Sequence, residues 1–207
     1  MAYVALDGPD GGGKSTQALA LCEHVRQLGR SVVHLREPGS TPVGEALRDL
    51  LLATSTGQLR PVTEALLFSA ARAELVERVI APALQRGEVV ISERCFVSTL
   101  AYQGLAYTDP AKALDYDWLL DLTRRVHGST LPDAVFVLDV DAEQAQRRCE
   151  ARTKDRFESR DEAFYDSVRS AYREIAERDP SVVLVDANQD EEQVQQQLRE
   201  HMARWLG

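Results

Sequence analysis

The amino-acid sequence predicts a doubly wound α/β fold, in which helices cover both faces of a parallel sheet. Short apolar runs alternate with longer helical patterns from end to end, and each run is continuously apolar, as in strands buried on both faces. A glycine-rich segment also separates the first apolar run from the first helical pattern. The 207 residues contain no internal repeat, low-complexity tract or linker, so we expect a single domain spanning residues 1–207.

Five apolar runs are the expected strands. They are Tyr3-Val4-Ala5-Leu6, Ser31-Val32-Val33-His34-Leu35, Val89-Val90-Ile91, Ala134-Val135-Phe136-Val137-Leu138 and Val182-Val183-Leu184-Val185. Because a helical segment separates each pair, we expect parallel strands joined by right-handed crossovers.

The helices are expected between these strands. The first ends at Gly29, which suits a C-cap, and the others span about 42–53, 61–85, 111–126, 142–152, 162–178 and 191–205. Asp139 and Asp141 follow the fourth apolar run, and we expect them to cap the helix that begins after them.

Composition excludes several classes of protein. The 24 basic and 33 acidic residues give a net charge of −9, which argues against a nucleic-acid polymer or a membrane surface as partner. The longest apolar runs are far below the ~20 residues of a membrane helix, and the chain does not open like a secretory signal. Cys22, Cys95 and Cys149 match no metal pattern, so they indicate free thiols in a reducing cytoplasm.

The glycine-rich segment is the strongest functional signal. It reads Gly8-Pro9-Asp10-Gly11-Gly12-Gly13-Lys14-Ser15 and satisfies G-x-x-x-x-G-K-[ST] between a strand and a helix. Its backbone N–H groups converge on phosphate oxygens, and the helix N-terminus adds partial positive charge. Lys14 is expected to reach the β- and γ-phosphates, and Ser15 to hold Mg²⁺. The sequence therefore predicts ATP or GTP binding.

Asp10 is unusual in such a loop, because a carboxylate repels phosphates. Two interpretations stay open. Asp10 caps the loop, as aspartate often does in turns, or it faces a group other than phosphate, such as a sugar hydroxyl of a second substrate.

Several motifs resemble those of thymidylate kinases, in the same order and spacing. They are Gly8 to Thr16, Arg36-Glu37-Pro38-Gly39, Glu93-Arg94 with Ser98-Thr99-Leu100-Ala101-Tyr102-Gln103, and Asp155-Arg156-Phe157-Glu158. The resemblance implies a P-loop kinase fold with a five-stranded parallel sheet, a flexible lid at about 147–162, a homodimer, and phosphoryl transfer from ATP to dTMP. It places ATP on Gly8 to Thr16 and Arg148, and Mg²⁺ near Ser15 and Glu93.

The chain departs from the family at several positions. Glu93 stands where aspartate is usual, Asp7 where glutamate is usual, and Ser40 where a second glycine often follows R-E-P-G. Position 11 is glycine, so the chain resembles the branch that carries its catalytic arginine in the lid rather than in the phosphate loop.

Arginines are the candidates for the acceptor phosphate, because guanidinium groups bind phosphate oxygens in pairs. We expect Arg36, Arg48 and Arg94 to do so, with Arg94 at the carboxyl end of a buried strand, where open α/β sheets bind ligands. For Arg48, a surface position on an amphipathic helix is an equal alternative.

The expected base pocket combines apolar and polar side chains. Phe68 and Pro38 would pack against the base, although a core position is the ordinary role for an aromatic residue at helical spacing. Arg72 is a donor suited to thymine O4 but not to the amino group of cytosine, and a solvated helix position is its alternative. Ser98, Thr99, Tyr102 and Gln103 complete the set, with Tyr102 expected under the sugar.

Arg148, Arg152, Arg156 and Arg160 recur every four residues and share one helix face. Such a row is usually solvated, but its like charges repel, so ATP under a closing lid would stabilise it. We expect Arg156, then Arg152, to be catalytic together with Asp10, Lys14 and Arg94. The four histidines show no ligand spacing and are assigned no chemistry.

Two other functions stay open at this stage. One is a P-loop kinase for a different monophosphate or a nucleoside, and the other is a nucleotide switch that binds ATP and a protein partner. Arginines at several separate strand ends favour a second phosphate over a partner surface.

Overall fold

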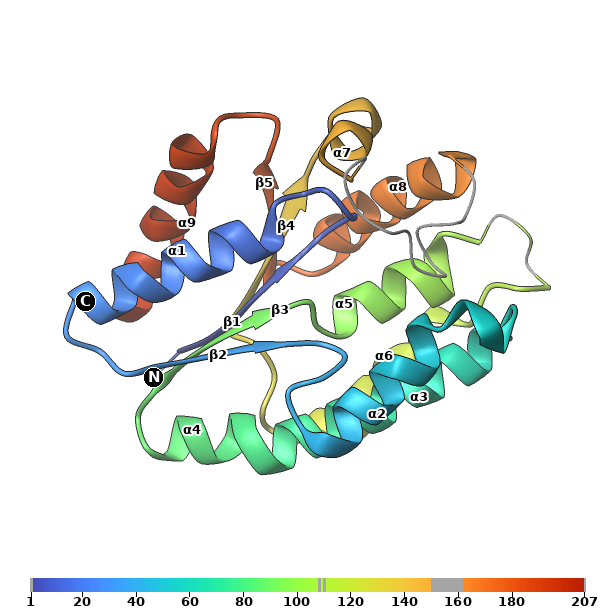
Figure 1. The fold of residues 1–207 in the computed structure, drawn as a ribbon, viewed down its shortest axis with the longest axis horizontal. Coiled ribbons are helices and arrows are strands. Elements are labelled where there is room, and N and C mark those ends of the chain that lie inside the picture. Colours follow the sequence, from blue (N-terminus) through green and yellow to red (C-terminus); the bar gives the residue numbers. More distant parts are fainter. Residues whose placement is uncertain (1, 108, 110, 150–161, 207) are drawn as a thin grey trace.

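The computed structural model describes residues 2–107, 109, 111–149 and 162–206. Its centre is a parallel sheet of five strands in the order β2-β3-β1-β4-β5, as expected (Figure 1). The strands are β1 (Ala2–Asp7), β2 (Val32–Arg36), β3 (Val89–Glu93), β4 (Ala134–Asp139) and β5 (Val182–Asp186). Every predicted strand is confirmed, but each continues past its apolar run into charged residues. These charged ends lie at one edge of the sheet, where a ligand can meet them.

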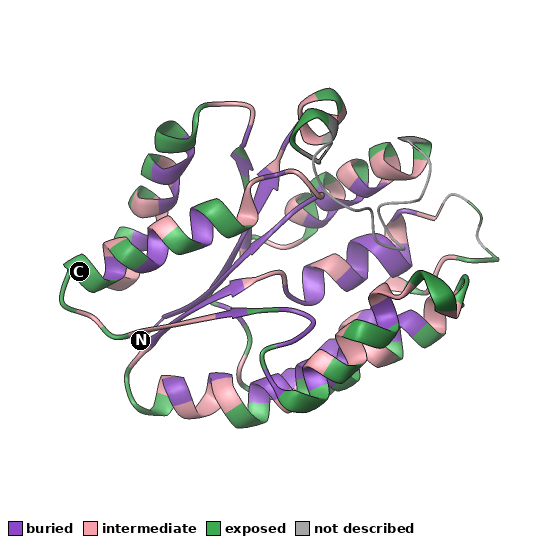
Figure 2. Ribbon diagram, in the orientation of Figure 1, coloured by how far each residue is buried: buried purple, intermediate pink, exposed green. Residues whose placement is uncertain are grey.

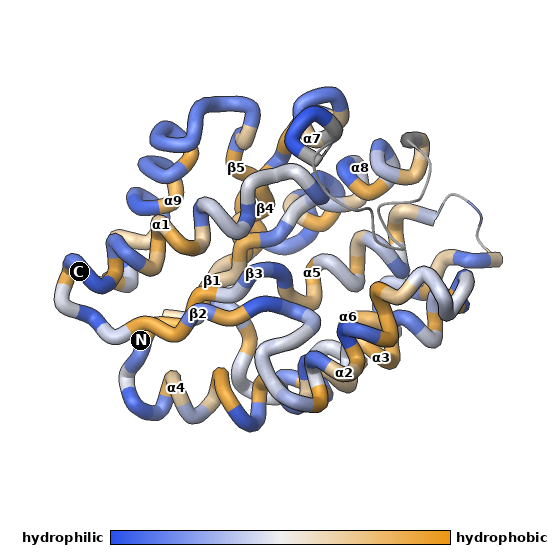
Figure 3. The backbone as a smooth tube through the Cα atoms, viewed as in Figure 1, coloured by the Kyte–Doolittle hydropathy of each residue, from blue (hydrophilic) through white to orange (hydrophobic). Residues whose placement is uncertain are grey.

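Helices cover both faces of the sheet. On one face α1 (Lys14–Gln27) and α9 (Glu191–Leu206) pack against Val4 and Leu6 of β1 and their neighbours. The other face is covered by α3 (Pro61–Leu75), α6 (Tyr116–His127) and α8 (Glu162–Arg178). Figure 2 shows the central strands β1, β3 and β4 buried and the outward helix faces exposed, and Figure 3 shows a similar contrast in hydropathy. The core is therefore two apolar layers on either side of one sheet.

The remaining elements complete the second face and the edge near the site. They are α2 (Pro42–Leu52), a short 3₁₀-helix η1 (Thr54–Thr56), a π-helix η2 (Val76–Ile80) with α4 (Ala81–Gln85), α5 (Phe96–Thr99) with a π-helix η3 (Leu100–Leu105), and α7 (Ala142–Cys149).

Two helix predictions need correction. The helix expected from 111 begins at Tyr116, because the Asp115 side chain caps it by accepting a hydrogen bond of 2.8 Å from the Trp118 N–H. The helical segment Phe96–Leu105 was missed altogether. Its residues are buried on nearly every side, so it lacks the polar face that reveals a helix in sequence.

The predicted helix at 61–85 is continuous in space but changes geometry at Val76–Ile80. Pro82 follows this π-helix and has no N–H to donate to the preceding turn, which accounts for the local rearrangement. Within the described residues, no helix combines the length and the apolarity needed to cross a membrane.

Candidate active site

A cavity of about 670 Å³ lies at the carboxyl ends of the central strands. It joins the phosphate loop after β1 to the ends of β2 and β3 and to α2, α3 and α5. Most predicted site residues line it: Asp10 to Thr16, Arg36, Pro38, Arg48, Phe68, Arg72, Glu93, Arg94, Ser98, Thr99, Tyr102, Gln103 and Arg148. Gly8 and Pro9 lie in the loop itself but not in this lining, and Arg152 and Arg156 fall outside the described residues.

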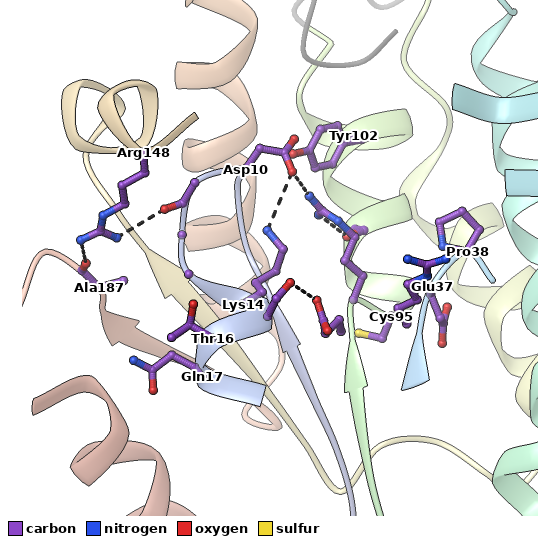
Figure 4. Close-up of a pocket in the computed structure, with 18 of the residues that line it drawn as sticks. Asp10, Lys14, Thr16, Gln17, Glu37, Pro38, Cys95, Tyr102, Arg148 and Ala187 are labelled. Carbon is purple, nitrogen blue, oxygen red and sulfur yellow. Dashed lines mark hydrogen bonds and ion pairs between the residues drawn. The ribbon is translucent and has the colours of Figure 1, made fainter. Parts of the chain in front are cut away.

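The phosphate loop is held by its own lysine. Lys14 Nζ donates hydrogen bonds to the carbonyl oxygens of Gly8 at 3.0 Å and Pro9 at 2.8 Å. It also lies 3.9 Å from an oxygen of Asp10 (Figure 4). Burial, with a further effect of the Arg94 charge, lowers the pKa of Lys14 to about 8. The surroundings of Lys14 therefore disfavour its charged form relative to water, and a bound anion would favour that form again.

Position 11 accepts only glycine. Gly11 has a φ of +79°, and a Cβ atom there would lie 2.4 Å from the Ala145 carbonyl oxygen of α7. Both the backbone conformation and the neighbouring helix thus exclude a side chain. A catalytic arginine cannot occupy this position of the loop.

Asp10 is paired with Arg94. Arg94 Nη2 donates to an Asp10 oxygen at 2.5 Å, and Arg94 Nη1 donates to the Gly8 carbonyl at 3.1 Å and to Ser98 Oγ at 3.0 Å. Burial opposes the Asp10 charge, but Arg94 and Lys14 outweigh it and lower the pKa of Asp10. The partners of Asp10 are side chains rather than the loop N–H groups that a cap binds, which weakens the capping interpretation.

Arg94 also has a strained backbone, with a φ of +70°. Residues other than glycine adopt this conformation rarely, and such strain is concentrated at functional sites. The guanidinium carbon of Arg94 lies 5.6 Å from the centre of the Tyr102 ring. Ser40 likewise has a φ of +64°, a conformation that glycine adopts more readily than serine.

Asp7 organises this region, and the sequence analysis did not assign it a role. Its buried carboxylate accepts hydrogen bonds from the N–H groups of Gly8 (2.9 Å), Cys95 (3.2 Å) and Ser98 (3.0 Å), from Ser98 Oγ (2.6 Å) and from the Tyr172 hydroxyl (2.8 Å). The sequence did contain a signal for this role, because Asp7 is a carboxylate that ends a buried strand directly before the phosphate loop. Asp7 joins the phosphate loop, α5 and α8.

Two predicted metal residues meet at the start of α1. Ser15 Oγ donates a short hydrogen bond to Oε2 of Glu93, and His34 Nε2 lies 2.9 Å from the other oxygen of Glu93. His34, to which no chemistry was assigned, is thus in contact with the site. Among the described residues, no three His, Cys, Asp or Glu side chains form a metal cluster. One carboxylate and one hydroxyl suit Mg²⁺, which keeps waters and substrate phosphates as its other ligands.

The arginines expected at the acceptor phosphate have different surroundings. Arg36 is half exposed, and its guanidinium pairs with Glu45 at 3.1 Å. Arg48 reaches from α2 to the Pro38 carbonyl at 2.9 Å, so it faces the cavity rather than open solvent. Together with Arg94 they bring three guanidinium groups to the part of the cavity near α2 and β3, with Arg36 and Arg94 each paired with a carboxylate, and such groups suit a phosphate.

Arg72 and Glu37 form a buried ion pair in the wall of the cavity. Arg72 Nε donates to Glu37 Oε2 at 2.5 Å, and the two side chains are 3% and 4% exposed. Arg72 Nη2 lies 3.5 Å from Thr99 Oγ1. Gln103 is fixed by its own acidic partner, since its Nε2 donates to Glu64 Oε2 at 2.9 Å. Glu37 itself lines the cavity, whereas Glu64 lies outside its lining. Arg72 and Gln103 are therefore each held in place by an acidic partner.

The opposite end of the cavity is closed by Arg148. Its guanidinium donates to the carbonyls of Gly11 at 3.3 Å and Ala187 at 3.1 Å, joining the phosphate loop to the turn after β5 (Figure 4). Figure 4 places Arg148 and Ala187 on the side away from Tyr102 and Pro38. The cavity thus has two ends with the phosphate loop between them.

Asp139 does not act as the expected helix cap. Its carboxylate pairs with Arg169 at 2.6 Å and Arg173 at 2.6 Å, both on α8, while Asp141 also pairs with Arg169 at 2.5 Å. The end of β4 is therefore joined to α8 by charge, a long-range pairing that the local sequence did not indicate.

A phosphate loop at the centre of a two-ended cavity, with arginines at the far end, defines a P-loop kinase that brings two phosphorylated molecules together. The family model for thymidylate kinase matches residues 6–198, and the chain belongs to this family.

Similar proteins cover almost the whole chain. The thymidylate kinase of Thermomicrobium roseum is 45% identical over 180 residues, which are 86% of this chain and 82% of that protein. The thymidylate kinase of Caulobacter vibrioides is 39% identical over 99% of this chain and 97% of its own length. That of Exiguobacterium sp. is 36% identical over 96% and 92%, respectively.

Proposed function

We propose that this chain is an enzyme that transfers the γ-phosphate of ATP to dTMP, giving dTDP and ADP. The observation that carries the proposal is the single cavity that joins the phosphate loop to a pocket of arginine, aromatic and amide side chains, in a member of the thymidylate kinase family. An acceptor phosphate oxygen forms a bond to the γ-phosphorus as the bond to the β-phosphate oxygen breaks. No covalent enzyme intermediate is needed, so positioning and charge neutralisation are the work of the protein.

The donor occupies the end of the cavity with Arg148 and the phosphate loop. Loop N–H groups and Lys14 receive the phosphates, and on binding Lys14 exchanges the Gly8 and Pro9 carbonyls for phosphate oxygens. We propose that Ser15 and Glu93 hold Mg²⁺ together with the nucleotide. When bound, the metal neutralises charge on the phosphates.

The acceptor occupies the other end. Arg36, Arg48 and Arg94 are proposed to hold its phosphate, while Arg72 donates to thymine O4 from its position on Glu37. Phe68, Pro38 and Tyr102 provide the apolar walls, and Thr99 and Gln103 the other polar contacts. We propose that Asp10 receives the 3′-hydroxyl of the sugar, since its carboxylate lies beside Arg94 and Tyr102 at the acceptor end of the cavity (Figure 4).

A further cation is needed over the transferring phosphoryl group, because metal and Lys14 alone seldom complete the set. The phosphate loop does not supply this cation at position 11, where the residue is glycine and Ala145 occupies the space that a side chain would need. We therefore propose that Arg156, supported by Arg152, supplies this charge.

The expected homodimer has one observation in its favour. Val43 and Leu50 of α2 and Leu66 of α3 are large apolar side chains that are 44–49% exposed, on two helices packed against each other. We propose a cytoplasmic homodimer, and light scattering coupled to size exclusion tests its assembly.

An acceptor series tests the function. ADP release is measured with dTMP, dUMP, dCMP, dGMP and AMP, and with no acceptor. We expect dTMP to give the highest kcat/KM. A different preferred acceptor would indicate another monophosphate kinase, and ADP release independent of any acceptor would indicate a nucleotide switch.

A further inference from the structure

The carboxylate of Glu93 is held from two sides. His34 Nε2 lies 2.9 Å from Oε1, and Ser15 Oγ donates a short hydrogen bond to Oε2. His34 belongs to β2 and Ser15 to the first turn of α1, so two separate elements act on one side chain. Both oxygens of Glu93 therefore have assigned partners in the described structure.

The strand register explains why the imidazole reaches Glu93. In the parallel pairing of β2 with β3, His34 is opposite Ile91 and Arg36 is opposite Glu93. His34 and Glu93 are thus diagonal neighbours on one face of the sheet, a separation that long side chains bridge. Their side chains are 26% and 17% exposed, so most of the contact is shielded from water.

The contact with His34 restricts the Glu93 side chain, whose rotamer the backbone alone does not fix. Glutamate has three rotatable bonds, and a carboxylate can reach Ser15 only in a few of their combinations. A hydrogen bond from His34 to Oε1 favours the rotamer of Glu93 in which Oε2 stays beside Ser15. His34 is not among the residues that line the cavity, so we expect its imidazole to act on Glu93 and not to contact the nucleotide directly.

We propose that His34 is a positioning residue for magnesium-nucleotide binding, acting through Glu93. The proposal rests on the proposed function insofar as Ser15 and Glu93 hold Mg²⁺. Partners of metal ligands generally influence metal affinity by 10–100-fold. Removing His34 should therefore weaken binding of the nucleotide only when the metal is present.

The test is calorimetric titration of ADP into the protein with Mg²⁺ and with EDTA, at one fixed pH. We expect His34→Leu to weaken binding about tenfold with Mg²⁺ and less than about twofold in EDTA. His34→Gln, whose amide nitrogen is a donor of similar reach, should recover affinity to within about threefold of the original protein. His24→Leu, on α1 and outside the cavity lining, is the matched control and should change neither value.

A second arm isolates the contact with Glu93. Aspartate at position 93 is one methylene shorter and should not reach His34, so His34→Leu should have no further effect in a Glu93→Asp background. Equal losses in both backgrounds, equal losses with Mg²⁺ and EDTA, or no loss at all would each overturn the proposal. If a thermal melt shows that His34→Leu does not fold, His34→Asn, which is polar but too short, replaces it under the same criteria.

Turnover of the unaltered protein with dTMP is measured separately. Its absence would refute the proposed function, whereas the metal dependence of ADP binding decides the role of His34.

Discussion

The Arg72–Glu37 pair should respond asymmetrically to removal of either partner. Both side chains are almost fully buried, and two unit charges about 4 Å apart attract by ~4 kcal/mol at an effective dielectric constant near 20. Breaking such a pair generally costs about 3–5 kcal/mol, because one charge remains buried without compensation. The two variants differ, however, in whether the group that remains can become neutral and so avoid being a buried charge.

Glu37→Gln leaves a guanidinium that does not give up its proton in proteins, so we expect a loss of about 3–5 kcal/mol at every pH. Arg72→Met leaves a carboxyl group that can become neutral. Burial already raises the pKa of Glu37 even though Arg72 opposes the shift, and without Arg72 the pKa should rise further. Arg72→Met should therefore cost less than Glu37→Gln in mild acid.

The two variants should also differ in how their stability depends on pH. With a raised pKa, folded Arg72→Met holds more protons than its unfolded chain above about pH 4.5, so its free energy of unfolding falls as pH rises. The slope is at most about 1.4 kcal/mol per pH unit relative to the original protein. Urea denaturation followed by circular dichroism at pH 5.5, 7.0 and 8.5 measures both effects.

The control is the exposed pair formed by Glu74 and Arg78 one turn further along the same helical segment. Glu74→Gln should cost less than about 0.5 kcal/mol, as exposed pairs generally do. Equal, pH-independent losses in Glu37→Gln and Arg72→Met, or losses no larger than in the control, would refute this reasoning.

Three further predictions concern catalysis. The pKa of Lys14 is about 8 before ligand binding, and a bound phosphate favours its charged form. ADP affinity should therefore be constant below about pH 7 and fall about tenfold between about pH 8 and 9.5. Calorimetric titrations measure this slope, and Lys14→Arg should remove it. Asp10→Ala should lower kcat/KM for dTMP far more than for 3′-deoxy-dTMP, and equal losses with the two acceptors would count against a contact with the 3′-hydroxyl. Arg156→Ala should reduce kcat by roughly 10²-fold or more with little change in ATP binding; wild-type kcat in both Arg156→Ala and Arg152→Ala would exclude the lid arginines.

Local patterns predicted most of the fold and much of the cavity lining. The five strands and the phosphate loop follow from residue types and spacing, whereas the R-E-P-G and A-Y-Q elements were assigned by their resemblance to thymidylate kinases. Arg94 directly follows β3, at the strand end where its place after a buried apolar run predicts it.

The missed features depend on contacts between distant parts of the chain. Glu37 is 35 residues from Arg72, and His34 is 59 residues from Glu93, so only the strand register and helix packing bring these groups together. Asp139 looked like a helix cap in its local context, but α8 approaches it with two arginines. Sequence pattern indicates which residues are available, whereas tertiary packing decides which of them are paired.

The hydrogen bonds that converge on Asp7 have a chemical consequence for the neighbouring cysteine. Cys95 lines the cavity, and its N–H donates to Asp7 while its Sγ lies 3.5 Å from the same carboxylate. Burial, followed by the negative charges of Asp7 and Glu37, raises the pKa of this thiol well above its ordinary value. Because the thiolate is the reactive form, alkylating reagents and peroxide should react slowly at Cys95. The site thus contains a sulfur atom that lines the cavity and is yet protected from oxidative damage, by burial first and by the neighbouring negative charges second.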